Sequence, residues 1–235
     1  MTRSSLPPSA AVLVGGGSGT RFGGEKLTGH LAGKPLVAHT LSAFEATEHI
    51  SEIILVVPAG REEEFRYIAR NSGVSKLTAV VPGGMRRHDS VLRGLKVVPS
   101  DIDLVAIHDA ARPLITPDLI ARSLEAAARE GAAAVAAPVT DTLHRIDESG
   151  FAAGTVDRSS LRAMQTPQVF RVQEIMALFD AAEGIPTDEV SLAMAAGKKV
   201  FLVEHSEPNI KVTWPQDVVM AEAILLARQG ESSAT

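Results

Sequence analysis

Five short apolar runs, separated by segments with helical periodicity, occupy residues 10–138 and constrain the fold more than any other feature. Each run is continuously apolar, as expected of parallel strands that helices cover on both faces. Strand and helix alternate along the whole stretch, so we predict a Rossmann-like, doubly wound, mostly parallel α/β sheet. The expected strands are 10–14, 52–57, 77–81, 103–108 and 132–138.

Helical patterns fill the gaps between these runs and continue after them. Thr116 and Pro117 form a favourable helix start, with threonine as N-cap and proline at the first helical position. A further strand is expected at 199–203. The expected helices are 35–47, 61–71, one carrying Val91, Leu92, Leu95 and Val98, then 116–130, 172–182, 188–196 and 215–228.

The domain organisation follows from length and patterning. The chain has 235 residues, 45% of them hydrophobic, which is enough for one substantial core. We expect a single domain over 10–230, with flexible ends at 1–9 and 230–235. Residues 140–165 depart from the pattern, because polar and apolar residues alternate there around Gly150 and Gly154. We predict that they form a β-arm protruding from the main sheet.

Composition excludes several classes of protein. The absence of cysteine excludes disulfides, cysteine zinc sites and thiol catalysis, and fits a reducing compartment. The net charge of −5 argues against a nucleic-acid-binding domain. No apolar run approaches the roughly 20 residues that span a bilayer, and the polar, proline-rich start does not resemble a signal peptide. We expect a cytoplasmic protein that binds neither nucleic acid nor membranes.

A glycine-rich loop, Gly-Gly-Gly-Ser-Gly-Thr-Arg at 15–21, follows the first expected strand. Such a loop lets backbone N–H groups approach a phosphate closely. It matches neither a Walker loop, which ends in Gly-Lys-Ser/Thr, nor a dinucleotide-binding Gly-x-Gly-x-x-Gly. Arg21 and Lys26 add two cations, as triphosphate chemistry requires. The alternative is a flexible connector with solvated charges.

Other candidate residues also follow expected strands, where doubly wound sheets bind ligands. A Gly-Gly turn at 83–84 and Ser90 follow the third strand. Asp109 lies at the carboxyl end of the fourth strand, directly after it, where a carboxylate could hold a hard cation, and Arg112 could bind a phosphate. The alternatives are an ordinary helix start at 83–91 and a buried Asp–Arg pair that closes the loop at 109–112.

Taken together, these motifs resemble those of the 2-C-methyl-D-erythritol 4-phosphate cytidylyltransferase family, over about 10–228. The loop is similar to that of sugar-phosphate nucleotidyltransferases in general. The remaining motifs, in the family's order, are Gly-Gly-x-x-Arg-x-x-Ser-Val at 83–91, His-Asp-Ala-Ala-Arg-Pro at 108–113, Asp-Thr at 141–142, Val-Asp-Arg at 156–158, Thr-Pro-Gln at 166–168, Thr-Asp-Glu at 187–189 and Asn-Ile-Lys-Val-Thr at 209–213.

The resemblance implies a nucleotidyltransferase-type sheet and transfer of CMP from CTP to 2-C-methyl-D-erythritol 4-phosphate, with release of pyrophosphate. It implies a Mg²⁺ site at Asp109 and a homodimer in which the 140–165 arm reaches the second subunit. The implied catalytic residues are Arg21, Lys26, Arg158 and Lys211. The implied CTP-binding residues are Gly15, Gly16, Gly17, Gly19, Gly83, Gly84 and Ser90. The implied residues for the sugar-alcohol phosphate are Arg112, Thr142, Arg158, Thr166, Thr187 and Thr213.

Three alternatives stay open on the sequence alone. A cytidylyltransferase for another polyol phosphate, such as ribitol 5-phosphate, would share most of these motifs. The family commonly has Ala-Ala-Gly where this chain has Gly-Gly-Gly at 15–17, and the Gly-Gly-Glu-Lys ending at 23–26 is similar to that of molybdopterin guanylyltransferases. A nucleotide-sensing module without catalysis is the third alternative. The conjunction of Arg21, Lys26, Asp109 and Lys211 disfavours it.

Overall fold

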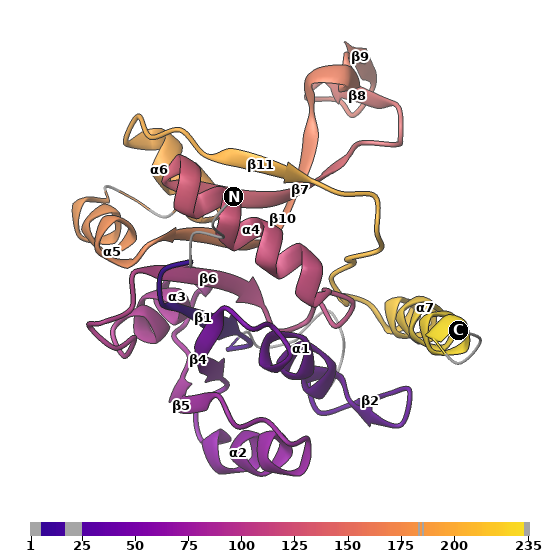
Figure 1. The fold of residues 1–235 in the computed structure, drawn as a ribbon. Coiled ribbons are helices and arrows are strands. Elements are labelled where there is room, and N and C mark those ends of the chain that lie inside the picture. The colour runs from indigo at the N-terminus through magenta and orange to yellow at the C-terminus, as the bar shows by residue number, and fades with distance from the viewer. Residues whose placement is uncertain (1–5, 17–24, 183, 185, 233–235) are drawn as a thin grey trace, which may run out of the picture.

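The computed structural model describes residues 6–16, 25–182, 184 and 186–232, which build a seven-stranded sheet with helices on both faces (Figure 1). All neighbouring strands are parallel except where β10 intervenes, so the predicted mostly parallel, doubly wound sheet is confirmed. In spatial order the strands are β11 (Phe201–Glu204), β7 (Ala132–Pro138), β10 (Arg162–Arg171), β6 (Leu104–Asp109), β1 (Ser9–Val14), β4 (Ile50–Val57) and β5 (Leu77–Pro82).

Two hydrophobic clusters, one on each face of the sheet, hold the helices in place. Successive residues of β1 alternate between them: Leu13 packs into one cluster, Val12 and Val14 into the other. The first cluster joins α1 (Leu36–Glu45), α2 (Glu62–Asn71), α4 (Pro117–Glu130) and α7 (Pro215–Ser232) to the sheet. The second joins α3 (Arg87–Leu95), α5 (Val172–Ala181) and α6 (Glu189–Ala195). Both faces are therefore covered, which explains the continuously apolar strands.

Strand β10 is antiparallel to both of its neighbours, β6 and β7, and the sequence patterning missed it. Its residues Arg162, Ala163 and Met164 pair with β7, so the expectation that 140–165 lies outside the main sheet is wrong at 162–164. Both neighbouring strands pair with β10 only over Gln168–Phe170. Its first half has one partner and keeps polar side chains, which explains why it resembles part of an arm.

A separate two-stranded hairpin, β8 (Leu143–Ile146) and β9 (Ala152–Val156), lies between β7 and β10 in sequence and projects away from the sheet (Figure 1). The 3₁₀ helix η1 (Arg158–Ser160) follows it. A smaller hairpin, β2 (His30–Leu31) and β3 (Lys34–Pro35), precedes α1. Within the ranges described above, no helix has the length and apolar character needed to cross a membrane.

The strands that surround the candidate site end at the same edge of the sheet. Because β1, β4, β5 and β6 are mutually parallel, the segments that follow them meet at their carboxyl ends. These segments begin at Gly15, Pro58, Gly83 and Ala110. The strand order places the start of the glycine loop, after β1, beside Asp109 at the end of the neighbouring β6, and Gly16 reaches past the end of β4 to the Gly-Gly turn.

Candidate active site

The base of the glycine loop touches the Gly-Gly turn, backbone against backbone. A Cβ atom on Gly16 would lie 2.9 Å from Gly83 Cα and 2.9 Å from Ser90 Oγ. A Cβ on Gly83 would lie 2.7 Å from Gly16 Cα, so neither position has room for a side chain. Gly15 donates its N–H to the Val56 carbonyl at 2.7 Å. The predicted residues Gly17, Gly19 and Arg21 lie outside the described residues.

The Ser90 hydroxyl stabilises the Gly-Gly turn through two hydrogen bonds. Its hydroxyl accepts a hydrogen bond from the Gly84 N–H at 3.0 Å and donates to the Arg86 carbonyl at 3.1 Å. The residue is buried in α3. Ser90 therefore holds the Gly-Gly turn in place, and the predicted contacts of the turn and of Ser90 with a nucleotide stay predictions.

Three cations face the carboxylate of Asp109, the last residue of β6. Lys211 Nζ lies 2.9 Å from Oδ2, Arg87 Nε 3.1 Å from Oδ1 and Arg112 Nε 3.5 Å from Oδ2. Burial raises the pKa of Asp109, but the three cations outweigh burial and hold the pKa well below its usual range. Asp109 is therefore an ionised, buried carboxylate at neutral pH.

The segment that carries Lys211 is bound to both the glycine-loop side and the β6 side of the site. Lys26 Nζ donates to the Val212 carbonyl at 3.0 Å. The Val212 N–H donates to the Ala111 carbonyl at 2.8 Å. These contacts bring the two predicted lysines, Lys26 and Lys211, to the same edge of the sheet although they lie at opposite ends of the sequence.

Arg112 and Thr166 are buried and make several internal contacts. Arg112 donates from Nη1 to the Asn209 carbonyl at 2.8 Å, in addition to facing Asp109. Thr166 Oγ1 accepts from the Asp109 N–H at 3.1 Å and lies 3.0 Å from His108 Nδ1. The buried Asp–Arg pair that the sequence left as an alternative is thus present. Contacts of Arg112 and Thr166 with a substrate stay predictions.

Four other predicted substrate residues come from three different parts of the fold. Thr142 and Arg158 are exposed at the base of the antiparallel β8–β9 hairpin, where Arg158 Nη1 donates to the Thr140 carbonyl. Thr213 donates its hydroxyl to the Lys211 carbonyl at 3.2 Å. Thr187 is exposed just before α6, whose N-cap is Asp188. The structure therefore assigns the cap to Asp188.

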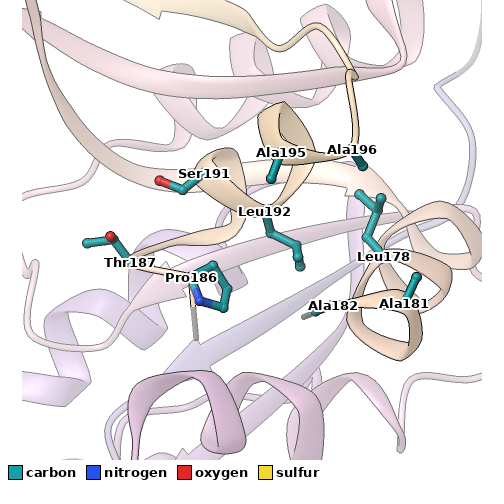
Figure 2. A pocket seen from close by; sticks show the side chains of 9 residues that line it. All are labelled: Leu178, Ala181, Ala182, Pro186, Thr187, Ser191, Leu192, Ala195 and Ala196. Atoms are coloured by element: carbon teal, nitrogen blue, oxygen red, sulfur yellow. The ribbon is translucent and has the colours of Figure 1, made fainter. Parts of the chain in front are cut away.

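Thr187 also borders a pocket between α5 and α6, with a volume of about 420 Å³ (Figure 2). Apart from Thr187 and Ser191, its lining is aliphatic, and it contains no charged side chain. None of the other predicted site residues lines it. Lys26, Asp109, Arg112, Thr166 and Lys211 instead gather near the carboxyl ends of β1 and β6.

Two charged residues of the site were missed by the sequence analysis. Arg87 donates from Nε to Asp109 at 3.1 Å and from Nη1 to both carboxylate oxygens of Glu189 at 2.8 and 2.9 Å. Both residues belong to motifs that the sequence analysis quoted: Arg87 is the arginine of the motif at 83–91, and Glu189 is the glutamate of the motif at 187–189. Neither pattern shows that the two side chains meet.

Asp109 is the one predicted metal ligand. Across the ranges that the structure describes, no group of three or more His, Cys, Asp or Glu side chains could hold a metal ion. Mg²⁺ typically binds through one or two carboxylates together with substrate phosphates and water. Asp109 supplies a single carboxylate, which fits that kind of site and does not fit an all-protein metal cage.

Comparison with known proteins gives a consistent family. A family model described as 2-C-methyl-D-erythritol 4-phosphate cytidylyltransferase matches residues 9–227. A protein of that name from Pelotomaculum thermopropionicum is 40% identical, over 94% of this chain and 95% of its own length. The crystal structure of 4-diphosphocytidyl-2C-methyl-D-erythritol synthase from Anaerococcus prevotii gives a TM-score of 0.83 at 26% identity, over 94% of this chain and 96% of that one. A 2-C-methyl-D-erythritol 4-phosphate cytidylyltransferase structure from Thermus thermophilus gives 0.74 at 32% identity, over 93% and 98%.

His108 provides a pH-dependent test of this site. Burial lowers the pKa of His108 to about 3, whereas an unfolded histidine titrates near 6.5. The unfolded chain therefore binds more protons between these values, and stability falls as the pH is lowered through this range. When the pH is lowered from 7 to 4.5, the free energy of unfolding should decrease in the wild type and in His108→Gln. We expect the decrease to be about 2 kcal/mol smaller in His108→Gln, which lacks the buried imidazole.

Urea unfolding at the two pH values measures this difference. The matched control is His144→Gln, on the exposed β8 strand. Wild-type pH dependence in the control and a smaller one in His108→Gln would support a neutral buried imidazole. Identical losses in all three proteins would contradict it.

Proposed function

The chain belongs to the 2-C-methyl-D-erythritol 4-phosphate cytidylyltransferase family, and from that membership we propose how its residues carry out the reaction. The enzyme transfers CMP from CTP to 2-C-methyl-D-erythritol 4-phosphate, giving 4-diphosphocytidyl-2-C-methyl-D-erythritol and pyrophosphate. The relatives carry the name of this activity, so neither ribitol 5-phosphate as acceptor nor guanylyl transfer is favoured.

One observation carries the proposed assignment of roles: Lys26 binds the segment that carries Lys211, near the carboxyl ends of β1 and β6. Lys26 Nζ bonds to the carbonyl of Val212, and Lys211 Nζ lies 2.9 Å from Asp109. The described base of the glycine loop lies at the same edge, since a Cβ on Gly15 would be 3.4 Å from Ala110 Cβ. A triphosphate that lies on this loop would have both ammonium groups beside its phosphates.

The proposed step is an in-line substitution at the α-phosphorus of CTP. An oxygen of the methylerythritol phosphate attacks, the bond to the β-phosphate breaks, and pyrophosphate leaves. The attacking phosphate is already ionised at neutral pH, so no protein nucleophile or general base is required. Arg21, Lys26 and Lys211 offset the negative charge that accumulates on the phosphates in the transition state.

For the nucleotide, we propose contacts from backbone groups of the two glycine segments. Gly15, Gly16, Gly17 and Gly19 would bind the phosphates. The carbonyl groups of Gly83 and Gly84 would recognise the edge of the pyrimidine. The Gly83 and Gly84 N–H groups instead hold this turn in place, through bonds to the Val57 carbonyl and the Ser90 hydroxyl. Mg²⁺, held by Asp109 and the phosphates, would supply further charge stabilisation.

For the acceptor, we propose a site shared between two subunits. Arg112, Thr142, Arg158, Thr166, Thr187 and Thr213 are the proposed contacts. An isolated two-stranded hairpin is at best marginally stable in water. The β8–β9 hairpin also exposes two large apolar residues, Ile146 by 73% and Phe151 by 71%. Both features fit a hairpin that packs against a second copy of the chain, bringing Thr142 and Arg158 to that copy's site.

We propose the cytoplasm as the location of the enzyme. The chain contains no cysteine, so it has no disulfide that would need an oxidising compartment. Fractionation of the native organism, with antibody detection of the full chain, tests this. Recovery with membrane or extracellular fractions would contradict it.

The first test is substrate specificity. Pyrophosphate release is measured with Mg²⁺, crossing CTP, GTP, ATP and UTP with methylerythritol 4-phosphate and ribitol 5-phosphate. We expect release with CTP and methylerythritol 4-phosphate to exceed every other pair. The same assay without divalent metal tests the Mg²⁺ requirement. Release only with GTP, or equal rates with both acceptors, would contradict the assignment.

The second test concerns the two lysines. Lys26→Ala and Lys211→Ala should each lower kcat by about 10²–10³-fold, because each removes a cation from the developing phosphate charge. Lys198→Ala is the matched control, since Lys198 is exposed and pairs with Glu174 on α5. Near-normal turnover in either site variant would remove that lysine from the proposed mechanism.

The third test asks whether the hairpin acts across subunits. Arg158→Ala and Lys211→Ala are each expected to be nearly inactive. If Arg158 serves the partner's site, half of the randomly mixed dimers are mixed and each has one intact site, which restores about a quarter of wild-type activity. Subunits are mixed after mild denaturation and refolding. Absence of recovery in verified mixed dimers would place Arg158 in its own subunit's site.

A further inference from the structure

Glu189 is a buried carboxylate to which the proposed mechanism gives no role. It is the first residue of α6, and only 2% of it is exposed. A carboxylate at this depth is costly unless it is paired and hydrogen-bonded. Both of its oxygens accept hydrogen bonds from Arg87 Nη1, at 2.8 and 2.9 Å.

The backbone on either side of Glu189 is fixed by one side chain of the central sheet. Gln168 Nε2 donates to Asp188 at 2.9 Å, and Gln168 Oε1 accepts from the Val190 N–H at 3.0 Å. Gln168 itself lies opposite Ile107 in the β10–β6 pairing. The start of α6 is therefore held in register with β6, the strand that ends at Asp109.

Arg87 connects the two carboxylates through different nitrogens. Nη1 binds Glu189, while Nε binds Asp109 Oδ1 at 3.1 Å. With Nη1 engaged, Arg87 approaches Asp109 through a single N–H, and Asp109 Oδ2 receives Lys211 at 2.9 Å. Without the contact to Glu189, the guanidinium would lose the hydrogen bonds that keep it from the bidentate geometry that arginine favours with a carboxylate.

We propose that Glu189 is a positioning residue for cytidylyl transfer: by holding Arg87 through Nη1, it fixes the orientation of the Asp109 carboxylate and with it the place of Lys211. The inference rests on the proposed roles of Asp109 and Lys211. Glu189 touches neither substrate. It acts through Arg87 on the residues that face the phosphates.

The test combines three variants with the wild-type enzyme. Glu189→Gln should lower kcat by about 10–100-fold, as loss of a partner that orients a site ligand typically does, with a much smaller change in the KM for CTP. Arg87→Gln should show a similar loss. The double variant Glu189→Gln/Arg87→Gln should be no slower than Arg87→Gln alone, because the two residues act as one unit.

Ser191→Ala is the matched control for a purely structural effect. The Ser191 hydroxyl bonds to Asp188 at the start of the same helix, and the substitution leaves the contact between Glu189 and Arg87 in place. It should reduce stability in urea without lowering kcat. A stability loss in Glu189→Gln with wild-type kcat, or additive losses in the double variant, would overturn the proposal.

A second measurement does not depend on turnover. In ¹⁵N spectra of the folded chain, the Arg87 Nε–H should be protected from exchange and should lose this protection in Glu189→Gln. An unchanged Arg87 signal would also overturn the proposal. If Glu189→Gln fails to fold, Glu189→Asp keeps the charge but shortens the reach, and the same loss of protection and of kcat is expected. Absence of pyrophosphate release by the wild-type enzyme would contradict the proposed function. The Arg87 Nε–H signal would still show whether Glu189 fixes the orientation of Arg87.

Discussion

The ion pairs of Asp109 join parts of the chain that are distant in sequence. Its carboxylate faces Arg87 from the start of α3, Arg112 from the loop after β6, and Lys211 from the segment before α7. Its backbone N–H bonds to Thr166 on β10. Removing one partner of such a buried network leaves uncompensated charge, which typically costs about 3–5 kcal/mol. The ion pairs that hold these segments together at this edge of the sheet therefore also position the charged residues of the candidate site.

Close packing between backbone segments brings these charges within reach. The absence of side chains at Gly16 and Gly83 lets the glycine loop and the Gly-Gly turn touch. At Gly94 in α3, an added Cβ would lie 2.4 Å from Val12 Cγ1 of β1, so the helix sits directly on the strand. Arg87 lies at the start of this helix. The distance between Arg87 and Asp109 thus depends on small residues that carry no charge.

Much of this arrangement could be predicted from the sequence, for a physical reason. Parallel strands buried on both faces must be continuously apolar, so 10–14, 52–57 and 103–108 are visible as strands. Strand β10 escapes this rule, because its first half pairs on one side only and keeps polar residues. Family resemblance located Asp109 and Lys211. The resemblance gave no role to Arg87 or Glu189. A charged residue near a helix start is usually solvated, and nothing in the sequence shows that these two side chains, 102 positions apart, are in contact.

Solvent exposure separates the charges that hold the site from those that could act in it. Glu189 and Arg112 are 2% and 11% exposed at their side chains and have fixed protein partners. Lys211 is 37% exposed, although its ammonium group pairs with the same carboxylate. An incoming anion can compete for the exposed ammonium more easily than for the guanidinium group of Arg112. If Lys211 acts as proposed, the cation that responds to charge on the phosphates is the one that the fold leaves accessible, and the pairs with Arg87 and Arg112 keep the Asp109 carboxylate in place.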